Sequence, residues 1–246
     1  MYLVTKENIH QMELEAWKKD AINRFDERMM DKEKHFPCIP ATMGYQLNRF
    51  CFGFISNPQH SRASKELALL LKEYSIIYKS IGTYTSLIIF YEPSPGYDEN
   101  FTVEKYEQIF WEQLYQLSKL DEMEWPCHIP INPNLPMWEY CFHGEQYFMY
   151  CATPSHINRN SRYFPYFMLA ITPRWVLEKF TASPQHAEKV KTKIRERLAD
   201  YDSISIHPAL NTYGKNDNYE WKQYFLRDDE TTLSECPFHK KKREQE

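Results

Sequence analysis

The sequence predicts an α+β protein with a mixed, mostly antiparallel sheet flanked by helices. Apolar strands and amphipathic helices alternate along the chain, but a β-hairpin interrupts the alternation at residues 138–151. No Gly/Ser-rich linker or low-complexity run divides the 246 residues. We therefore expect a single domain over 1–246, with a helical N-terminal part at 1–34 and a tail at 228–246.

The first third of the chain is predicted to form a helix, a strand and a second helix. Residues 5–31 carry an approximate apolar stripe between charged positions and are expected to form one helix, which the prolines of 35–40 end. Aromatic residues alternate through 48–55, which is typical of a strand. Ser64 is expected to cap a helix that extends to Tyr78.

The remaining elements follow from apolar runs and from helix-start signals. Residues 85–91 form a near-continuous apolar run, as in a buried strand, and Thr102 is expected to cap a helix that ends near Leu120. Proline-rich 125–136 is expected to be irregular. The later elements are predicted as a strand at 166–171, a short helix from 173, and a surface helix from Ser183-Pro184 to about 199.

The central hairpin is the clearest local signal. Its first strand places three aromatic residues on one face, Trp138, Tyr140 and Phe142, and Glu139, Cys141 and His143 on the other. His143-Gly144-Glu145 is a plausible tight turn, because Gly144 can adopt the positive φ that such turns require. Pro154 makes continued central pairing after Cys151 improbable.

Composition and charge exclude several classes of protein. The net charge is −4, and the only basic run is Lys240–Arg243 at the tail, so we expect no nucleic-acid partner. The start has no signal-peptide pattern, and no apolar run approaches ~18 residues, so we expect a cytoplasmic protein that does not bind membranes. The six cysteines form no C-x-x-C pair and are expected to be reduced thiols.

Familiar catalytic motifs are missing. The sequence contains no G-x-G-x-x-G, Walker loop or G-x-S-x-G, which disfavours the corresponding nucleotide-binding folds and α/β-hydrolase chemistry. It also lacks H-x-E and H-E-x-x-H, the usual zinc hydrolase signatures. A catalytic site in this protein would therefore have to use residues outside these known motifs.

The polar loop after the hairpin is the main candidate site. It carries His156, Arg159 and Arg162, and two arginines beside a histidine can bind carboxylates. Haem needs an axial imidazole and anchors for two propionates, so this group is a chemically sensible haem cradle. The alternative is that His156 is a solvent-exposed or hydrogen-bonding residue with no metal.

Other residues are candidates that have simpler structural readings. Cys38 lies in a rigid Phe-Pro-Cys-Ile-Pro stretch and could be a thiolate ligand, a redox thiol or a small buried side chain. Arg49 lies among aromatic residues and needs a protein or ligand carboxylate. Glu145 could receive a cationic substrate or be only a turn residue. The remaining candidates are His128, His207 and Asp228-Asp229.

An ordered set of short motifs resembles the YqcI/YcgG family over about residues 35–239. The motifs are Phe36-Pro37-Cys38 with the Arg49 strand, Trp125-Pro126 with Ile129-Pro130, Trp138-Glu139, Gly144-Glu145 with Phe148, His156 through Ser161-Arg162, Pro173-Arg174, Asp228-Asp229 and Cys236-Pro237-Phe238. Each is short, and their order makes the set specific.

The resemblance implies a haem b oxygenase that hydroxylates a nitrogen of a small amino acid, such as the guanidine nitrogen of L-arginine. It implies His156 as the iron ligand, with Arg159 and Arg162 beside it as cofactor-binding residues. Arg49 and Cys38 are further cofactor-binding candidates, and Glu145 is the candidate catalytic carboxylate that would face a cationic guanidinium. O2 or peroxide and an unidentified electron donor would be its co-reactants, and a homodimer is compatible with the aromatic content. A non-catalytic haem-binding or haem-sensing protein, or an interaction protein with no haem, is the alternative.

Overall fold

The computed structural model describes residues 3–9, 11–94, 100–181 and 183–238. Its elements are β1 Val4–Thr5, α1 Lys6–Ile9, α2 Ala16–Met30, α3 Ile39–Gln46, β2 Phe50–Ile55, α4 Ala63–Ile81, β3 Ser86–Tyr91, α5 Val103–Lys119, β4 Tyr140–Phe142, β5 Glu145–Ala152, the 3-10 turn η2 Asn160–Arg162, β6 Met168–Pro173, α6 Arg174–Thr181, α7 Pro184–Tyr201 and α8 Trp221–Tyr224.

The described strands form one mixed sheet in the order β1-β2-β3-β6-β5-β4. Only β2 and β3 run parallel to each other; the other neighbouring pairs are antiparallel. This confirms the predicted α+β class and the mostly antiparallel sheet. The parallel pair is joined through α4, as a parallel connection requires a crossover.

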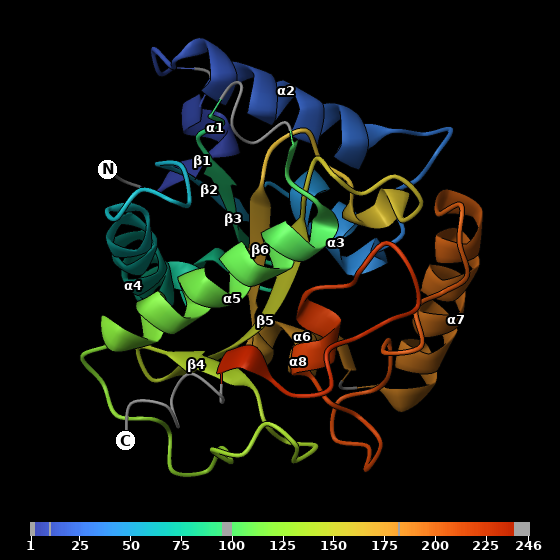
Figure 1. The fold of residues 1–246 in the computed structure, drawn as a ribbon. Helices are drawn as coiled ribbons and strands as arrows, with labels where there is room; N and C mark the ends of the chain where they lie inside the picture. Colours follow the sequence, from blue (N-terminus) through green and yellow to red (C-terminus); the bar gives the residue numbers. More distant parts are fainter. Residues whose placement is uncertain (1–2, 10, 95–99, 182, 239–246) are drawn as a thin grey trace.

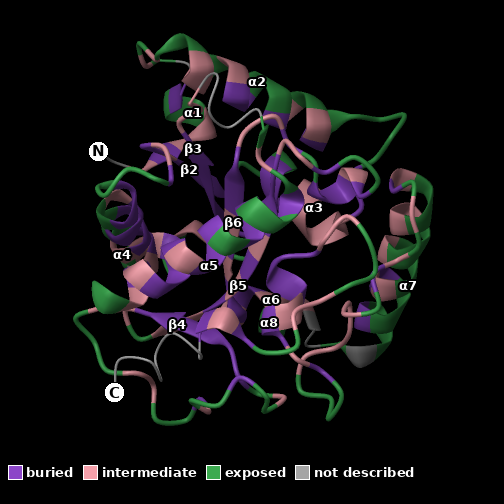
Figure 2. Ribbon diagram, in the orientation of Figure 1, coloured by how far each residue is buried: buried purple, intermediate pink, exposed green. Residues whose placement is uncertain are grey.

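Helices cover both faces of the sheet, so the side chains of β3 are buried on both sides (Figure 1). Leu87, Ile89 and Tyr91 pack with α4 and α5, whereas Ile88 and Phe90 pack with α2 and α3. A strand that is buried on both faces explains the near-continuous apolar run at 85–91. Figure 2 shows the buried sheet and the largely exposed outer helix α7.

The hairpin turn forms as the sequence predicts. His143 has φ 50° and Gly144 has φ 74°, so both central residues lie in the left-handed region that two-residue hairpin turns use. Tyr140 pairs with Tyr147 and Phe142 with Glu145. The turn fixes the register of β4 on β5 and therefore decides which side chains of β5 face each layer.

Two predictions about the first third of the chain are wrong. Residues 5–31 do not form one helix, because Val4 and Thr5 pair with the edge of β2 and the chain breaks between α1 and α2. Ser64 does not cap α4; it lies inside the first turn, and its hydroxyl donates to Gln113 at 3.2 Å. In both cases a tertiary partner overrides a local helix signal.

Thr102 does cap α5, since its hydroxyl oxygen accepts the backbone N–H of Lys105 at 3.2 Å. Ser183 stands at the N-cap position of α7, with Pro184 following it, although its side chain makes no capping hydrogen bond. No helix in the described ranges has the length and hydrophobicity needed to cross a membrane.

Candidate functional site

The loop that follows β5 buries the three residues predicted to hold a cofactor. Thr153 pairs with Tyr163 across the loop, and η2 closes the turn between them. His156, Arg159 and Arg162 are 2%, 1% and 4% exposed. Buried polar groups of this kind must find partners inside the protein, so their contacts decide what they can do.

Both ring nitrogens of His156 are hydrogen-bonded within the chain. Nε2 donates to the carbonyl oxygen of Leu226 at 2.8 Å, because that oxygen can only accept. Nδ1 therefore lacks a proton in the neutral ring and accepts from the Thr153 hydroxyl at 2.8 Å. Burial lowers the pKa of His156 to about 4, so the ring is neutral at pH 7.

The two arginines contact backbone carbonyls of the C-terminal segment. Arg162 donates to Tyr224 O at 2.8 Å and to Gln223 O at 2.9 Å. Arg159 donates to the carbonyl oxygens of Arg227 and Asp229, each at 2.9 Å. Each guanidinium thus fastens a different part of the same segment.

Two aspartates complete this arrangement. Asp228 accepts the backbone N–H groups of Ile157, Asn158 and Arg159 at 2.7–3.0 Å. Asp202 accepts the backbone N–H and hydroxyl of Ser161 at 2.6 and 2.8 Å and lies 3.7 Å from Arg159. We call His156, Arg159, Arg162, Asp202 and Asp228 the polar clamp. It holds residues 223–229 against the loop after β5.

Asp228→Ala is expected to lower the free energy of unfolding by about 1–3 kcal/mol, because three backbone donors of the loop lose a charged acceptor. Urea unfolding at pH 7 measures the loss. The matched control is Asp200→Ala at an exposed position of α7, where we expect a change within about 0.5 kcal/mol. Equal effects of the two substitutions would contradict a role of Asp228 in the clamp.

Glu145 lies far from the polar clamp. It begins β5, and the clamp follows the end of that eight-residue strand, roughly 20 Å away at the rise of a strand. Its carboxylate accepts the Tyr78 hydroxyl at 2.8 Å and the Lys79 ammonium at 3.1 Å. The structure therefore does not bring Glu145 to His156, and its catalytic role stays a prediction.

Arg49 and Cys38 are likewise not part of the polar clamp. Arg49 precedes β2, at the same end of the sheet as Glu145, and its guanidinium donates to the carbonyl oxygen of Ile81. Cys38 precedes α3. Burial raises the pKa of its thiol, although the charge of Arg162 opposes the shift, so Cys38 carries a neutral thiol at pH 7.

These contacts decide whether His156, Arg159 and Arg162 could bind haem. A haem ligand at His156 would need a ring nitrogen with a free lone pair toward a cavity, and propionates would need guanidinium N–H groups. Both nitrogens and both guanidinium groups instead bind atoms of this chain. As folded, this group does not fit haem. No cluster of three His, Cys, Asp or Glu side chains suited to a metal ion occurs in the ranges described.

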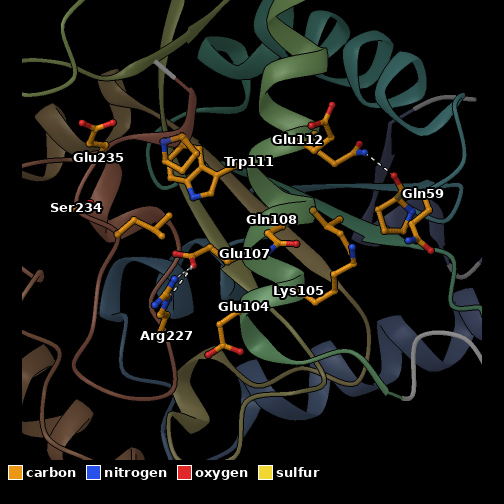
Figure 3. A pocket seen from close by; sticks show the side chains of 15 residues that line it. Gln59, Glu104, Lys105, Glu107, Gln108, Trp111, Glu112, Arg227, Ser234 and Glu235 are labelled. Carbon is orange, nitrogen blue, oxygen red and sulfur yellow. Dashed lines mark hydrogen bonds and ion pairs between the residues drawn. The ribbon is translucent and has the colours of Figure 1, made fainter. Parts of the chain in front are cut away.

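A cleft of about 770 Å³ extends along α5, with residues of 227–237 on one side of the helix and Pro58 and Gln59 on the other (Figure 3). Glu107 pairs with Arg227 across it at 2.7 Å, and Trp111 follows one turn along α5. Burial raises the pKa of Glu107 despite this pair. Sequence reasoning missed these residues; the signal was Glu104, Glu107 and Trp111 at helical spacing on one face.

A second buried polar cluster was also missed. Arg174 donates to Glu139 at 2.7–2.8 Å through Nε and to Glu220 at 2.7 Å through Nη2, and its guanidinium lies 3.6 Å from the ring centre of Tyr213. Burial raises the pKa of Glu139 to about 7, against the opposing effect of Arg174. The cluster joins the residue just before β4, the start of α6 and the residue just before α8.

Sequence comparisons agree with the motif set. The YqcI/YcgG family pattern matches residues 25–239. The chain belongs to the YqcI/YcgG family. It is 44% identical to "Uncharacterized protein YqcI" of Bacillus subtilis over 229 residues, covering 93% of this chain and 90% of that protein. "Uncharacterized protein YcgG" of the same organism is 43% identical over 228 residues, with the same shares covered.

A more distant relative carries a functional name. "Putative N(omega)-hydroxy-L-arginine synthase DcsA" of Streptomyces lavendulae is 28% identical over 243 residues, which cover 96% of this chain and 89% of that protein. No solved structure matches the chain.

Proposed function

We propose that this member of the YqcI/YcgG family is an oxygenase that hydroxylates a nitrogen of a small amino acid, with the guanidine of L-arginine as the first candidate. The observation that carries the proposal is the relative named as an N(omega)-hydroxy-L-arginine synthase, which aligns with 96% of this chain. The acidic cleft beside α5 supports it, because a guanidinium is a cation.

The reaction must balance in atoms and electrons. Insertion of one oxygen atom from O2 into an N–H bond gives N–OH, and the second oxygen atom leaves as water. That stoichiometry consumes two electrons and two protons, which a separate reductant must supply. With peroxide as the oxidant, the same product and one water form without an added reductant.

Haem b is the proposed cofactor, as the family resemblance implies. His156 is not assigned as its ligand, because both ring nitrogens are hydrogen-bonded inside the polar clamp. The absorption spectrum of protein purified from haem-supplemented cells tests for the cofactor through its Soret band. A protein without that band that gains no thermal stability from hemin would overturn the haem part of the proposal.

Turnover is tested separately. Purified protein is incubated with L-arginine, a reductant and O2, or with peroxide, and mass spectrometry follows the gain of one oxygen atom. We expect N-hydroxylated product that depends on the protein and on the oxidant. A protein that shows a Soret band but yields no hydroxylated product from L-arginine, L-lysine or L-ornithine would support the haem-binding alternative instead.

A further inference from the structure

The cleft beside α5 combines a cavity with an excess of negative charge (Figure 3). On the side of α5 that faces the C-terminal segment, the charged lining residues are Glu104, Glu107 and Glu235 against Arg227; Lys105 and Glu112 line the hollow on the other side of the helix. A volume of about 770 Å³ lies within the range of small-molecule sites. The cleft is thus large enough for an amino acid and favours a cation.

The negative charge is greatest at one end. Glu107 is neutralised by Arg227, whereas Glu104 makes no ion pair with any residue that the structure describes. At Glu104 the cleft adjoins a second hollow of about 510 Å³, which Asp228 and Asp229 also line. Asp228 is occupied by backbone donors of the loop, but the negative charges of Glu104 and Asp229 both act on Glu107. We therefore expect a cationic group to bind at Glu104, which borders both hollows.

The other end offers a donor without an acceptor. Trp111 is 2% exposed and lines the cleft, and its indole N–H has no hydrogen-bond partner. A buried donor left unpaired costs roughly 1–3 kcal/mol and calls for an explanation. Figure 3 shows the indole on the side of α5 that carries Glu107, against the C-terminal segment. An acceptor on a ligand, with a small movement of the ring, would satisfy it.

Arg227 stands between these two ends. Nε and Nη2 contact Glu107 at 2.9 and 2.7 Å, and Nη1 donates to Thr231 at 3.3 Å. A guanidinium has five N–H groups, so two of them remain for a ligand carboxylate. Glu104 and Trp111 are seven residues apart on α5, or roughly 10 Å along its axis. That separation suits an extended amino acid with a long cationic side chain.

We propose that this cleft binds a basic amino acid, with its side-chain cation at Glu104 and its α-carboxylate at Trp111 and Arg227. The choice of L-arginine as the probe rests on the proposed function, but the recognition itself rests on the cleft. The ligand must carry both charges: a side-chain cation for the acidic end and a carboxylate for the donors.

Isothermal titration calorimetry of the full chain tests this with three probes. L-Arginine carries both groups, L-citrulline replaces the guanidinium by a neutral ureido group, and agmatine lacks the carboxylate. We expect L-arginine to bind, and each of the other two to bind roughly tenfold more weakly or worse, because each loses one charge-assisted contact. Failure of L-arginine to bind the wild-type protein overturns the inference.

Two variants separate the two ends of the site. Glu104→Gln should weaken L-arginine roughly tenfold and L-citrulline little, because only the cationic contact changes. Trp111→Phe keeps an aromatic ring but removes the N–H, so it should weaken L-arginine and leave agmatine unchanged. Because Trp111 packs against Phe110, Trp221 and Tyr224, Trp111→Phe should lower the melting temperature somewhat, and binding is therefore measured well below the melting temperature of the variant. Glu196→Gln, at an exposed position of α7, is the matched control.

The outcomes distinguish this inference from the proposed function. If wild-type protein hydroxylates L-arginine but Glu104→Gln and Trp111→Phe bind and react like wild type, the function stands and this site is wrong. If the variants lose binding as expected but no hydroxylation occurs, the site stands and the function is wrong. Unaltered binding of all three probes by both variants also overturns the site.

Discussion

Arg174→Met is expected to lower the free energy of unfolding by about 3–5 kcal/mol, because it leaves two buried carboxylates without their shared cation. Glu139 and Glu220 are 0% and 3% exposed, and Arg174 donates to both. Methionine keeps much of the side-chain volume, so packing changes little. Urea unfolding at pH 8 measures the loss.

The same variant should regain stability as the pH falls. Burial raises the pKa of Glu139, and loss of Arg174 removes the charge that opposes this shift, so the folded variant binds a proton that the unfolded chain releases. Its free energy of unfolding therefore decreases as pH rises above the unfolded carboxyl pKa, and the defect should be smaller at pH 5 than at pH 8. Arg24→Met, which breaks an exposed ion pair with Asp20, should cost less than about 1 kcal/mol at both. An equal defect at both pH values would contradict buried, ionised partners.

Acid is expected to destabilise the wild-type protein through His156. Its pKa is lowered from about 6.5 to about 4 by burial, so the folded state binds fewer protons than the unfolded state between these values. The stabilising contribution is fully present above pH 6.5 and is lost as pH falls through 4. One pKa unit corresponds to about 1.4 kcal/mol, which gives roughly 3 kcal/mol for this shift.

His156→Gln isolates that contribution. A glutamine amide can donate to Leu226 O and accept from Thr153 as the imidazole does, but it does not titrate. We expect urea unfolding between pH 4 and 6.5 to show a slope shallower than wild type by the His156 contribution. His207 remains in both proteins as an internal reference, because burial also lowers its pKa to about 4. Identical slopes in the two proteins would mean that His156 is not buried and neutral in solution.

The partners of the polar clamp lie in a distant segment, which the local sequence of the His156 loop does not reveal. Its residue types, a histidine and two arginines leaving one strand, suggest a cradle for a ligand with carboxylates. In the fold, the carbonyl oxygens of residues 223–229 take the places that such a ligand would occupy. That segment lies more than 60 residues further along the chain, and local pattern carries no information about where it docks.

Several of the short motifs that are far apart in the sequence lie together in the fold. Trp138-Glu139 and Pro173-Arg174 meet in one buried ion cluster. The motif from His156 to Arg162 meets Asp228 in the polar clamp. Clusters of this kind need partners from several elements, because an ionised group is stable inside a protein only when it is paired. The motifs identified the residues, and the tertiary structure paired them.

The sequence by itself determined the strands β2 to β6, the hairpin turn at His143-Gly144, the α5 cap and the fold class. These depend on periodicity and on local backbone geometry, which neighbouring residues decide. Only the tertiary structure decided that residues 5–31 break into β1, α1 and α2, that His156 is a buried hydrogen-bonding residue, and that Glu107 and Arg227 face each other across a cleft. Those features depend on contacts between segments that are far apart in the sequence, and the pattern of neighbouring residues does not determine the free energy of such contacts.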